Sequence, residues 1–378
     1  MNIAVVIKTR ELSGTQKRSA KIASALNDRG HLATLFLDEQ THRALTTRDY
    51  RFDWPNIVVW SYPFRIRALG VGGKSFAHIR DILGLSRLDL RLRKRYWSQL
   101  FKEHKIDVAH LYIKWRMCQE MPIPHIFEIT SPDIARNIIK QGNPFPPQTL
   151  LHPNSEGVAS VLESLHLSNE TSVAPHAYFD PNEPSDFVPP KKENLIVFAH
   201  RLVERKNPVL FAKAAKRFLA ERPDWRIAVR GEGPLSEEVQ QILADEIQLG
   251  RALFGFEPNL MDELYRSRIF VSIESEDNYS NQSVLEAMWC RNALVLSDRG
   301  RTKARYFANN GVLCEPEEES VFAALIDLAD DTSGLASKAA NSRRHVETAF
   351  SRDEYLNHLE SVYRLAMHCR GDLPTDAS

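Results

Sequence analysis

Short runs of consecutive apolar residues alternate with longer amphipathic segments along most of this chain, and the alternation occurs twice. The first run, Met1–Lys8, is apolar at successive positions rather than at every second one, which is typical of a strand buried on both faces of a parallel sheet. A helical pattern over 16–28 follows it, and His31–Leu37 is the next apolar run. This order predicts α/β domains with parallel sheets, and its first unit is of Rossmann type.

The pattern assigns further elements to both halves of the chain. In the first half, strands are predicted at 56–60, 106–112, 123–129 and 171–176, and helices at 85–102 and 155–165. In the second half, strands are predicted at 195–199, 225–230, 252–256, 269–273, 293–296 and 311–314, and helices at 208–221, 236–247, 259–266 and 351–368. We therefore expect two domains built on the same plan.

The segment 180–194 divides the two halves. It holds four prolines and six charged residues among fifteen, a composition that cannot build a core and is typical of an interdomain linker. The predicted domains are 1–182, a linker at 183–194, and 195–348. A C-terminal helix within 349–370 is expected to pack back on the first domain, and 371–378 is expected to form a disordered tail.

Composition limits the class of protein. Lysine plus arginine equals aspartate plus glutamate at 49 each, so no overall positive charge favours nucleic acid as a partner. Four widely spaced cysteines favour reduced thiols over disulfides or a zinc site, as in a cytoplasmic protein. No uncharged apolar stretch reaches the about 18 residues of a membrane span. We predict a soluble protein, attached at most to the inner face of a membrane.

The stretch from Phe270 to Cys290 is the strongest local candidate for a binding site. A short apolar run ends in an acidic loop, and the loop leads into a helical pattern that Ser283 could cap. A helix N-terminus after a strand offers free N–H groups to a phosphate, while Glu274, Glu276 and Asp277 could accept hydrogen bonds from sugar hydroxyls. The alternative is an acidic, solvent-exposed loop followed by an ordinary helix.

The first half offers three further candidates. Gly14 follows the first strand, where it would let the backbone approach a ligand closely or simply form a turn. His110 and Glu128 are expected at the carboxyl ends of two strands, where open α/β sheets bind ligands. A single histidine at such a place is more often a hydrogen-bonded core residue.

A basic segment in the predicted helix 85–102 is a candidate surface site. It carries Arg87, Arg91, Arg93, Lys94 and Arg95 beside two aromatic residues. This cluster could contact an anionic acceptor or an anionic membrane surface. The alternative is the solvent-exposed face of an ordinary helix.

The second half resembles the donor-binding domain of retaining glycosyltransferases of family four. The motifs occur in the order typical of that family. They are Arg201-Leu-Val-Glu-Arg-Lys206, Arg230-Gly-Glu-Gly-Pro234, Phe254-Gly-Phe256, an acidic loop before Leu285-Glu-Ala-Met288, and Ala293-Leu-Val-Leu-Ser-Asp298. The pattern covers about 195–330 and extends more weakly over the first half.

The resemblance implies the GT-B fold, in which two Rossmann-like domains face each other across a cleft. It implies retaining transfer of a sugar from a nucleotide-diphosphate donor to a glycan, lipid-linked or small-molecule acceptor, without metal or cofactor. Arg201 and Lys206 would stabilise the departing diphosphate. Glu286 would bind the nucleotide ribose, and His110 would act in the cleft.

The acid that contacts the donor sugar has three candidates. The family spacing from Glu286 falls on Asn278, whereas Asp277, which we favour, and then Glu276 would fit a loop one or two residues longer. Gly14, His200, Gly231 and Ser283 complete the predicted donor site. His200 stands where the family commonly has a glycine.

Two other functions fit the same pattern. A nucleotide-sugar epimerase would share the fold and the two cations but would need no acceptor. A degenerate binding module would explain why glycines usual beside the first acid are replaced by Tyr279, Ser280 and Asn281. Acceptor-dependent nucleotide release separates these alternatives from sugar transfer.

Overall fold

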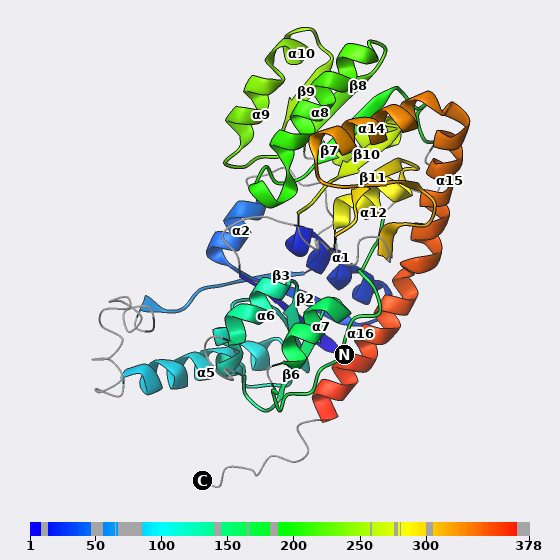
Figure 1. The fold of residues 1–378 in the computed structure, drawn as a ribbon. Coiled ribbons are helices and arrows are strands. Elements are labelled where there is room, and N and C mark those ends of the chain that lie inside the picture. The colour runs from blue at the N-terminus through cyan, green and yellow to red at the C-terminus, as the bar shows by residue number, and fades with distance from the viewer. Residues whose placement is uncertain are drawn as a thin grey trace, which may run out of the picture. The chain divides into compact units, whose positions relative to one another are not determined.

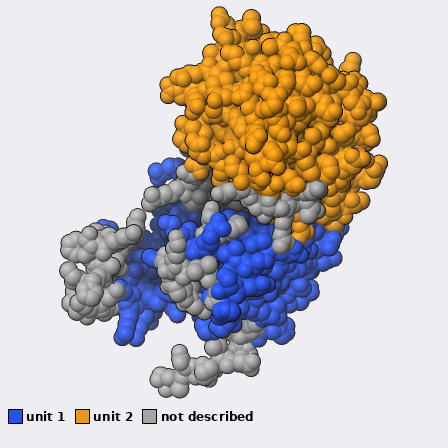
Figure 2. Space-filling view, in the orientation of Figure 1, with its two compact units in different colours: residues 1–178, 352–378 blue, residues 179–351 orange. Residues whose placement is uncertain are grey.

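The computed structural model shows that the chain forms two compact units. Unit 1 comprises 1–178 and 352–378, and unit 2 comprises 179–351 (Figure 2). The predicted boundaries at 182 and 348 lie a few residues from this division. The structure describes residues 1–8, 14–46, 56–64, 66, 85–139, 145–164, 166–181, 188–257, 259–275, 279, 281–299 and 305–368. The predicted tail, 371–378, lies outside these residues.

Unit 1 contains a six-stranded parallel sheet in the order β3-β2-β1-β4-β5-β6. Its strands are β1 (Asn2–Ile7), β2 (Leu32–Asp38), β3 (Ile57–Trp60), β4 (Val108–Tyr112), β5 (His125–Ile129) and β6 (Thr149–Pro153). Its helices are α1 (Gly14–Asp28), α2 (Glu39–Thr46), α5 (Leu85–Glu103), the 3₁₀ helix η2 (Trp115–Glu120), α6 (Pro132–Ile139), α7 (Glu156–Glu163) and α16 (Arg352–His368).

Burial on both faces explains the continuous apolar run of β1. Ile3 and Val5 pack with α1 and with Leu359 and Tyr363 of α16. The intervening residues of β1 face the opposite core, which includes Trp97 of α5. The C-terminal helix α16 therefore belongs to unit 1, where it covers the same face of the sheet as α1 (Figure 1).

Unit 2 repeats the architecture with the order β12-β11-β10-β7-β8-β9, again all parallel. Its strands are β7 (Leu195–Ala199), β8 (Arg226–Arg230), β9 (Ala252–Gly255), β10 (Ile269–Ser272), β11 (Ala293–Ser297) and β12 (Gly311–Cys314). Its helices are η3 (Glu204–Lys206), α8 (Pro208–Glu221), α9 (Ser236–Ile242), α10 (Ala244–Gln248), α11 (Leu260–Arg266), α12 (Gln282–Trp289), α14 (Glu318–Asp330) and α15 (Thr332–Ala349).

The strand order places a switch point at the centre of each sheet. In unit 2 the chain runs outward from β7 through β8 to β9, then returns to form β10 on the other side of β7. Open parallel sheets bind ligands at the carboxyl ends of the two strands where the order reverses. In unit 2 these strands are β7 and β10, so the fold itself indicates where a site belongs. The predicted fold of two Rossmann-like domains is confirmed.

Three sequence-based boundaries are wrong. The segment 171–176 is not a strand: it makes one isolated bridge, between Thr171 and Leu151, and β6 is the edge strand instead. The helix predicted at 236–247 divides into α9 and α10 at Leu243. Gly14 is the first residue of α1 rather than part of the preceding loop. The Ser155 cap is confirmed, since its hydroxyl accepts a hydrogen bond from the Val158 N–H.

The end of the proline-rich segment is anchored to unit 2. The ammonium of Lys192 donates to the carbonyl oxygens of Ser267 and Cys290, at 2.5 and 2.6 Å. These carbonyls lie at the C-terminal ends of α11 and α12, where cations are favoured by the helix dipole. Burial lowers the pKa of Lys192 to about 8. The C-terminal end of this proline-rich segment is therefore part of unit 2, although the composition of the segment predicted a linker.

Within the described residues, no helix is long and apolar enough to cross a lipid bilayer.

The packing of α16 on unit 1 makes a testable prediction. Leu359 is fully buried, so Leu359→Ala should lower the free energy of unfolding by about 2–5 kcal/mol through lost packing and a residual cavity. Leu249→Ala is the matched control, because Leu249 is 68% exposed. Denaturant unfolding measures both variants, and equal stability of the two would contradict the burial of α16.

Candidate functional site

Polar and charged side chains gather where β7 and β10 end. His200 and Arg201 follow β7 directly, and Lys206 ends the 3₁₀ helix η3 one turn later. Glu274 follows β10, beside β7 in the sheet. Arg201 is exposed, whereas the other three residues are buried. The two cations predicted to hold a diphosphate thus belong to the loop that leaves the first strand of the switch point.

An ion pair joins the two loops. The Nζ atom of Lys206 lies 2.6 Å from Oε1 of Glu274, and the two side chains are 8% and 5% exposed. Burial lowers the pKa of Lys206 to about 8, although the neighbouring carboxylate acts in the opposite direction. Burial raises the pKa of Glu274, and the charge of Lys206 opposes that shift. Each charge therefore stabilises the other in a mostly buried position.

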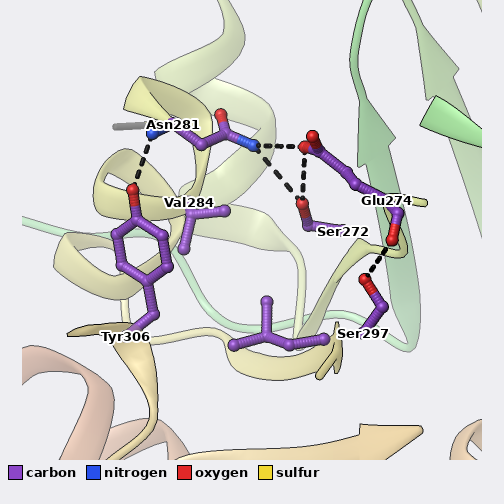
Figure 3. A pocket seen from close by; sticks show the side chains of 7 residues that line it. Ser272, Glu274, Asn281, Val284, Ser297 and Tyr306 are labelled. Carbon is purple, nitrogen blue, oxygen red and sulfur yellow. Dashed lines mark hydrogen bonds between the residues drawn. The ribbon is translucent and has the colours of Figure 1, made fainter. Parts of the chain in front are cut away.

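Several polar groups fix the Glu274 carboxylate in place (Figure 3). Its Oε1 accepts hydrogen bonds from Nδ2 of Asn281 at 3.2 Å and from the Ser272 hydroxyl at 3.3 Å. Its main-chain oxygen accepts one from the Ser297 hydroxyl at 2.8 Å. Together with Tyr306, these residues line a cavity of about 10 Å³, which is about the smallest space that can hold one water molecule.

Gly231 allows the turn after β8 to approach the β7 loop. A Cβ atom at this position would lie 2.0 Å from the main-chain oxygen of His200, and the φ angle of Gly231 is +145°. Any side chain would therefore be strained and would collide with backbone. The predicted donor-site residues His200 and Gly231 are in direct contact.

His200 has its own partner in the neighbouring strand. Its Nε2 donates to the carbonyl oxygen of Val271 at 3.1 Å. Burial, together with the charge of Lys206, lowers the pKa of His200 to about 3. The imidazole is therefore neutral at physiological pH, and it links β7 to β10 beside the cations without adding charge.

Helix α12 begins at the same place, but Asn281 rather than Ser283 caps it. The Asn281 side chain accepts a hydrogen bond from the Ser283 N–H. The Ser283 hydroxyl instead donates to the carbonyl oxygen of Ala199, the last residue of β7, at 3.0 Å. Glu286 is half-buried and stands one turn further along the side of the helix that carries Ser283. Ser283 and Glu286 therefore lie near the switch point.

The three candidates for the acid that contacts the donor sugar, Glu276, Asp277 and Asn278, lie outside the described residues. Glu274 and Asn281, which flank them, are fixed by the interactions above.

His110 lies inside the core of unit 1 rather than at the end of its strand. It is the third residue of β4 and is fully buried. Its Nε2 lies 3.2 Å from Oε2 of Glu128, and its Nδ1 lies 3.0 Å from the Tyr363 hydroxyl of α16. Burial lowers the pKa of His110. His110 therefore lies in the middle of β4 and not at its carboxyl end, as was expected. Glu128 is the last residue but one of β5 and is also buried.

The His110 cluster also contains the one group of side chains among the described residues with the geometry of a metal site. Ligand atoms of His110, Glu128 and His152 lie within 4.8 Å of one another. Glu128, however, already forms a 2.7 Å ion pair with Arg18, and His152 donates to it at 2.6 Å. Burial alone would raise the pKa of Glu128, but His152 and Arg18 hold it well below its usual range. Because these bonds satisfy the carboxylate, we assign the cluster a structural role.

The basic helix α5 exposes most of its predicted cluster. Arg87, Arg91, Lys94 and Arg95 are exposed at positions that share one face of the helix. Arg93 differs: its Nε lies 2.8 Å from Asp89, and its guanidinium stacks 4.4 Å from the centre of the Tyr62 ring. Arg93 therefore belongs to the packing of unit 1 and not to the exposed basic face.

A second cavity lies at the start of α8. It has a volume of about 310 Å³, and its lining includes Glu204, Asn207, Lys213, Leu235 and Glu318. Asn207 is held in the left-handed region at φ 51°, and its side chain donates to the carbonyl oxygen of Ile273 at 2.8 Å. This contact is a second link between the loops after β7 and β10.

A family model matches the part of the chain that contains the switch point of unit 2. Residues 180–345 match the model described as glycosyl transferases group 1. The resemblance of the second half to glycosyltransferases is confirmed. The matched segment holds every element of the switch point described above, including η3, the Gly231 turn and α12. No curated protein matches the chain.

Solved structures of glycosyltransferases share the fold of the whole chain. A glycosyltransferase from Rickettsia africae is 12% identical, with a TM-score of 0.69 over 97% of this chain and 98% of that one. Anabaena HepE in complex with UDP is 16% identical, with a TM-score of 0.68 over 97% and 100% of the two chains. A mutant of S. aureus TarM in complex with fondaparinux, alpha-GlcNAc-glycerol and UDP is 11% identical, with a TM-score of 0.72 over 96% and 99%. The two Rossmann-like units therefore have the GT-B fold.

The sequence predicted Arg201, Lys206 and Ser283 as site residues, but it did not predict the groups that Lys206 and Ser283 contact. Asn281 is a residue type favoured at helix N-caps and stands just before the apolar run of α12, so its role could have been inferred. The Lys206–Glu274 pair joins residues from two loops that are distant in sequence. No local pattern reports such a contact.

The burial of His110 makes a prediction that separates a core role from a catalytic one. His110→Asn should lower the free energy of unfolding by about 1–3 kcal/mol, because it leaves buried partners without hydrogen bonds. The expected main effect is on stability, as measured by denaturant unfolding. A variant with wild-type stability and greatly reduced turnover would instead give His110 a catalytic role.

Proposed function

We propose that the chain transfers a sugar, with retention of configuration, from a nucleotide-diphosphate donor to a hydroxyl group of a glycan, lipid-linked or small-molecule acceptor. The observation that carries the proposal is the position of Arg201 and Lys206 at the switch point of unit 2. Lys206 lies in a buried setting and Arg201 in an exposed one.

The chemistry requires positive charge at the leaving group. As the bond between the sugar C1 and the diphosphate oxygen breaks, the electron pair and a growing negative charge move to the diphosphate. Fixed cationic donors stabilise that charge more in the transition state than in the ground state. The guanidinium of Arg201 and the ammonium of Lys206 would provide it without a metal ion.

Groups around the cations would bind the rest of the donor. The backbone of the turn at Gly231, which packs directly on the β7 loop, would lie beside the diphosphate. The N-terminal end of α12 has N–H groups suited to an anion. Glu286 would accept hydrogen bonds from the ribose hydroxyls, and an acid in the segment 276–278 would contact the sugar.

Retention would follow if the acceptor oxygen attacks C1 on the face that the diphosphate leaves. The acceptor proton would then pass to the departing phosphate oxygen, so no protein base would be needed. This part of the proposal is supported by the resemblance to retaining glycosyltransferases. The anomeric configuration of the product, read by NMR, decides between retention and inversion.

The ligands of the similar structures suggest which donors to test first. HepE was solved with UDP and with UDP-glucose, and a pneumococcal O-GlcNAc transferase was solved with UDP and GlcNAc. We therefore propose a uridine-diphosphate sugar as the first donor to screen, with other nucleotides after it.

The two cations make the central prediction. Arg201→Ala and Lys206→Ala should each lower kcat by about 10²-fold or more, since each removes charge stabilisation of the leaving group. Lys191→Ala and Arg344→Ala are matched controls on exposed cations of unit 2 and should keep wild-type rates. Nucleotide release from a panel of nucleotide sugars measures the effect.

Glu286→Ala separates binding from chemistry in the same assay, since it should mainly weaken nucleotide affinity.

Wild-type rates in folded Arg201 and Lys206 variants would rule out the proposed clamp. Acceptor-dependent release supports transfer, conversion of the free nucleotide sugar supports an epimerase, and binding without turnover supports a degenerate module.

We propose in addition that the exposed basic face of α5 contacts an anionic membrane, on the cytoplasmic side. Each exposed cation near an anionic surface contributes about 1 kcal/mol. Four such residues share this face of α5. An anionic, lipid-linked acceptor would be recruited by the same charges.

Vesicle sedimentation tests this proposal. Arg91→Glu combined with Lys94→Glu should reduce binding to vesicles with anionic phosphatidylserine by roughly tenfold or more, and high salt should have the same effect on wild type. The control is Lys191→Glu combined with Arg344→Glu, which makes the same charge change on unit 2. Equal binding of the two double variants would contradict a role for α5.

A further inference from the structure

Glu274 stands out because it neutralises one of the two cations that the proposed function needs. It is the second residue after β10, and Lys206 reaches it from the loop after β7. A carboxylate at a diphosphate site would ordinarily weaken binding by repulsion. Its presence 2.6 Å from Nζ of Lys206 therefore calls for a physical explanation.

The hydrogen bonds around this ion pair hold the Glu274 carboxylate in place, and the Lys206 ammonium depends on that carboxylate for its position. Glu274 is held through Asn281, Ser272 and Ser297, which belong to the α12 cap, β10 and β11 (Figure 3). Asn281 is itself held, because its N–H donates to the Tyr306 hydroxyl at 2.6 Å. Among the described residues, Glu274 is the only partner found for the Lys206 ammonium.

We propose that Glu274 is a positioning residue for Lys206: its fixed carboxylate holds the ammonium group at the switch point, where the donor diphosphate would bind. An ammonium has three N–H donors. One points at Glu274, which leaves the others for phosphate oxygens. This inference rests on the proposed function for its ligand, but the contact between the two side chains stands independently of it.

The second effect of Glu274 is to keep Lys206 charged. Burial lowers the pKa of Lys206 to about 8, and Glu274 is the neighbour that opposes this shift. The other ionisable groups nearby cannot replace it: Arg205 carries a like charge, and His200 is neutral because burial lowers its pKa to about 3. Arg201 would add a further positive charge. Loss of Glu274 would therefore favour the neutral amine.

The sign of the expected pH dependence follows from these charges. In wild type, Lys206 is charged below about pH 8 and loses its proton above it. In Glu274→Gln, the midpoint should fall by roughly one to three pH units, because an opposite charge within 4 Å is removed. Diphosphate binding that depends on the charged ammonium should therefore be lost, as the pH is raised, at a lower pH in Glu274→Gln than in wild type.

The first experiment measures Lys206 directly and needs no ligand. In protein labelled with ¹³C-lysine, the Cε signal of Lys206 is assigned by its absence in Lys206→Arg and is titrated from pH 6 to 11. Glu274→Gln should lower its midpoint by at least one pH unit, and Glu274→Asp should restore part of the shift. An unchanged midpoint in folded Glu274→Gln would overturn the positioning role.

A matched control excludes a general effect of breaking a buried ion pair. Glu246 pairs with Arg251 at 2.5 Å, and Arg251 precedes β9, an edge strand of the same sheet, whereas β7 and β10 lie at its centre. Glu246→Gln also removes a mostly buried carboxylate, so it should cost stability without moving the Lys206 midpoint. A shift of equal size in Glu246→Gln would contradict a specific effect of Glu274.

The second experiment measures UDP, GDP and ADP binding by calorimetry between pH 6 and 9. At pH 8.5, Glu274→Gln should bind the preferred nucleotide at least about fivefold more weakly than wild type, and this difference should shrink as the pH is lowered to 6. Equal affinities at both values would contradict the inference. If wild type binds none of the three nucleotides, the proposed function fails, whereas the lysine titration still decides whether Glu274 positions Lys206.

Discussion

The contact between the loops after β7 and β10 is the constraint on which the candidate site depends. These strands are neighbours in the sheet but not in the sequence, because the chain forms β8 and β9 before it returns to build β10. The Lys206–Glu274 ion pair, the Ser283 hydroxyl on Ala199 and the His200 imidazole on Val271 all bridge this junction. Each bridge satisfies a buried polar group, so the site is ordered by the same interactions that join the two halves of the sheet.

Two opposite charges, those of Lys206 and Glu274, are buried together in this region. A buried lysine without a partner would lose its proton, and a buried carboxylate would gain one. Here the two hold each other in the charged state, and the carboxylate is in turn held by the cap of α12. The arrangement resembles a preorganised donor site, in which the cost of desolvating the cation is met during folding rather than during binding. Removing either partner leaves the other uncompensated.

In unit 1, buried polar residues join secondary-structure elements to one another. Arg18, Glu128, His110 and His152 form a closed hydrogen-bonded cluster that ties three strands to α16. The contact through Tyr363 explains why a helix at the far end of the sequence folds as part of the first domain. His110 is fully buried in the middle of its strand, whereas open parallel sheets bind ligands just beyond the strand ends.

The sequence by itself determined the two α/β halves, their parallel strands and the position of Arg201 and Lys206, because burial on both faces leaves an unmistakable run of apolar residues and because loops after such strands carry ligand groups. It also gave the resemblance to glycosyltransferases. Only the tertiary structure decided that Glu274 holds Lys206, that Asn281 caps α12 and that His110 is a core residue. These facts depend on contacts between segments far apart in the chain, which no local periodicity or spacing encodes.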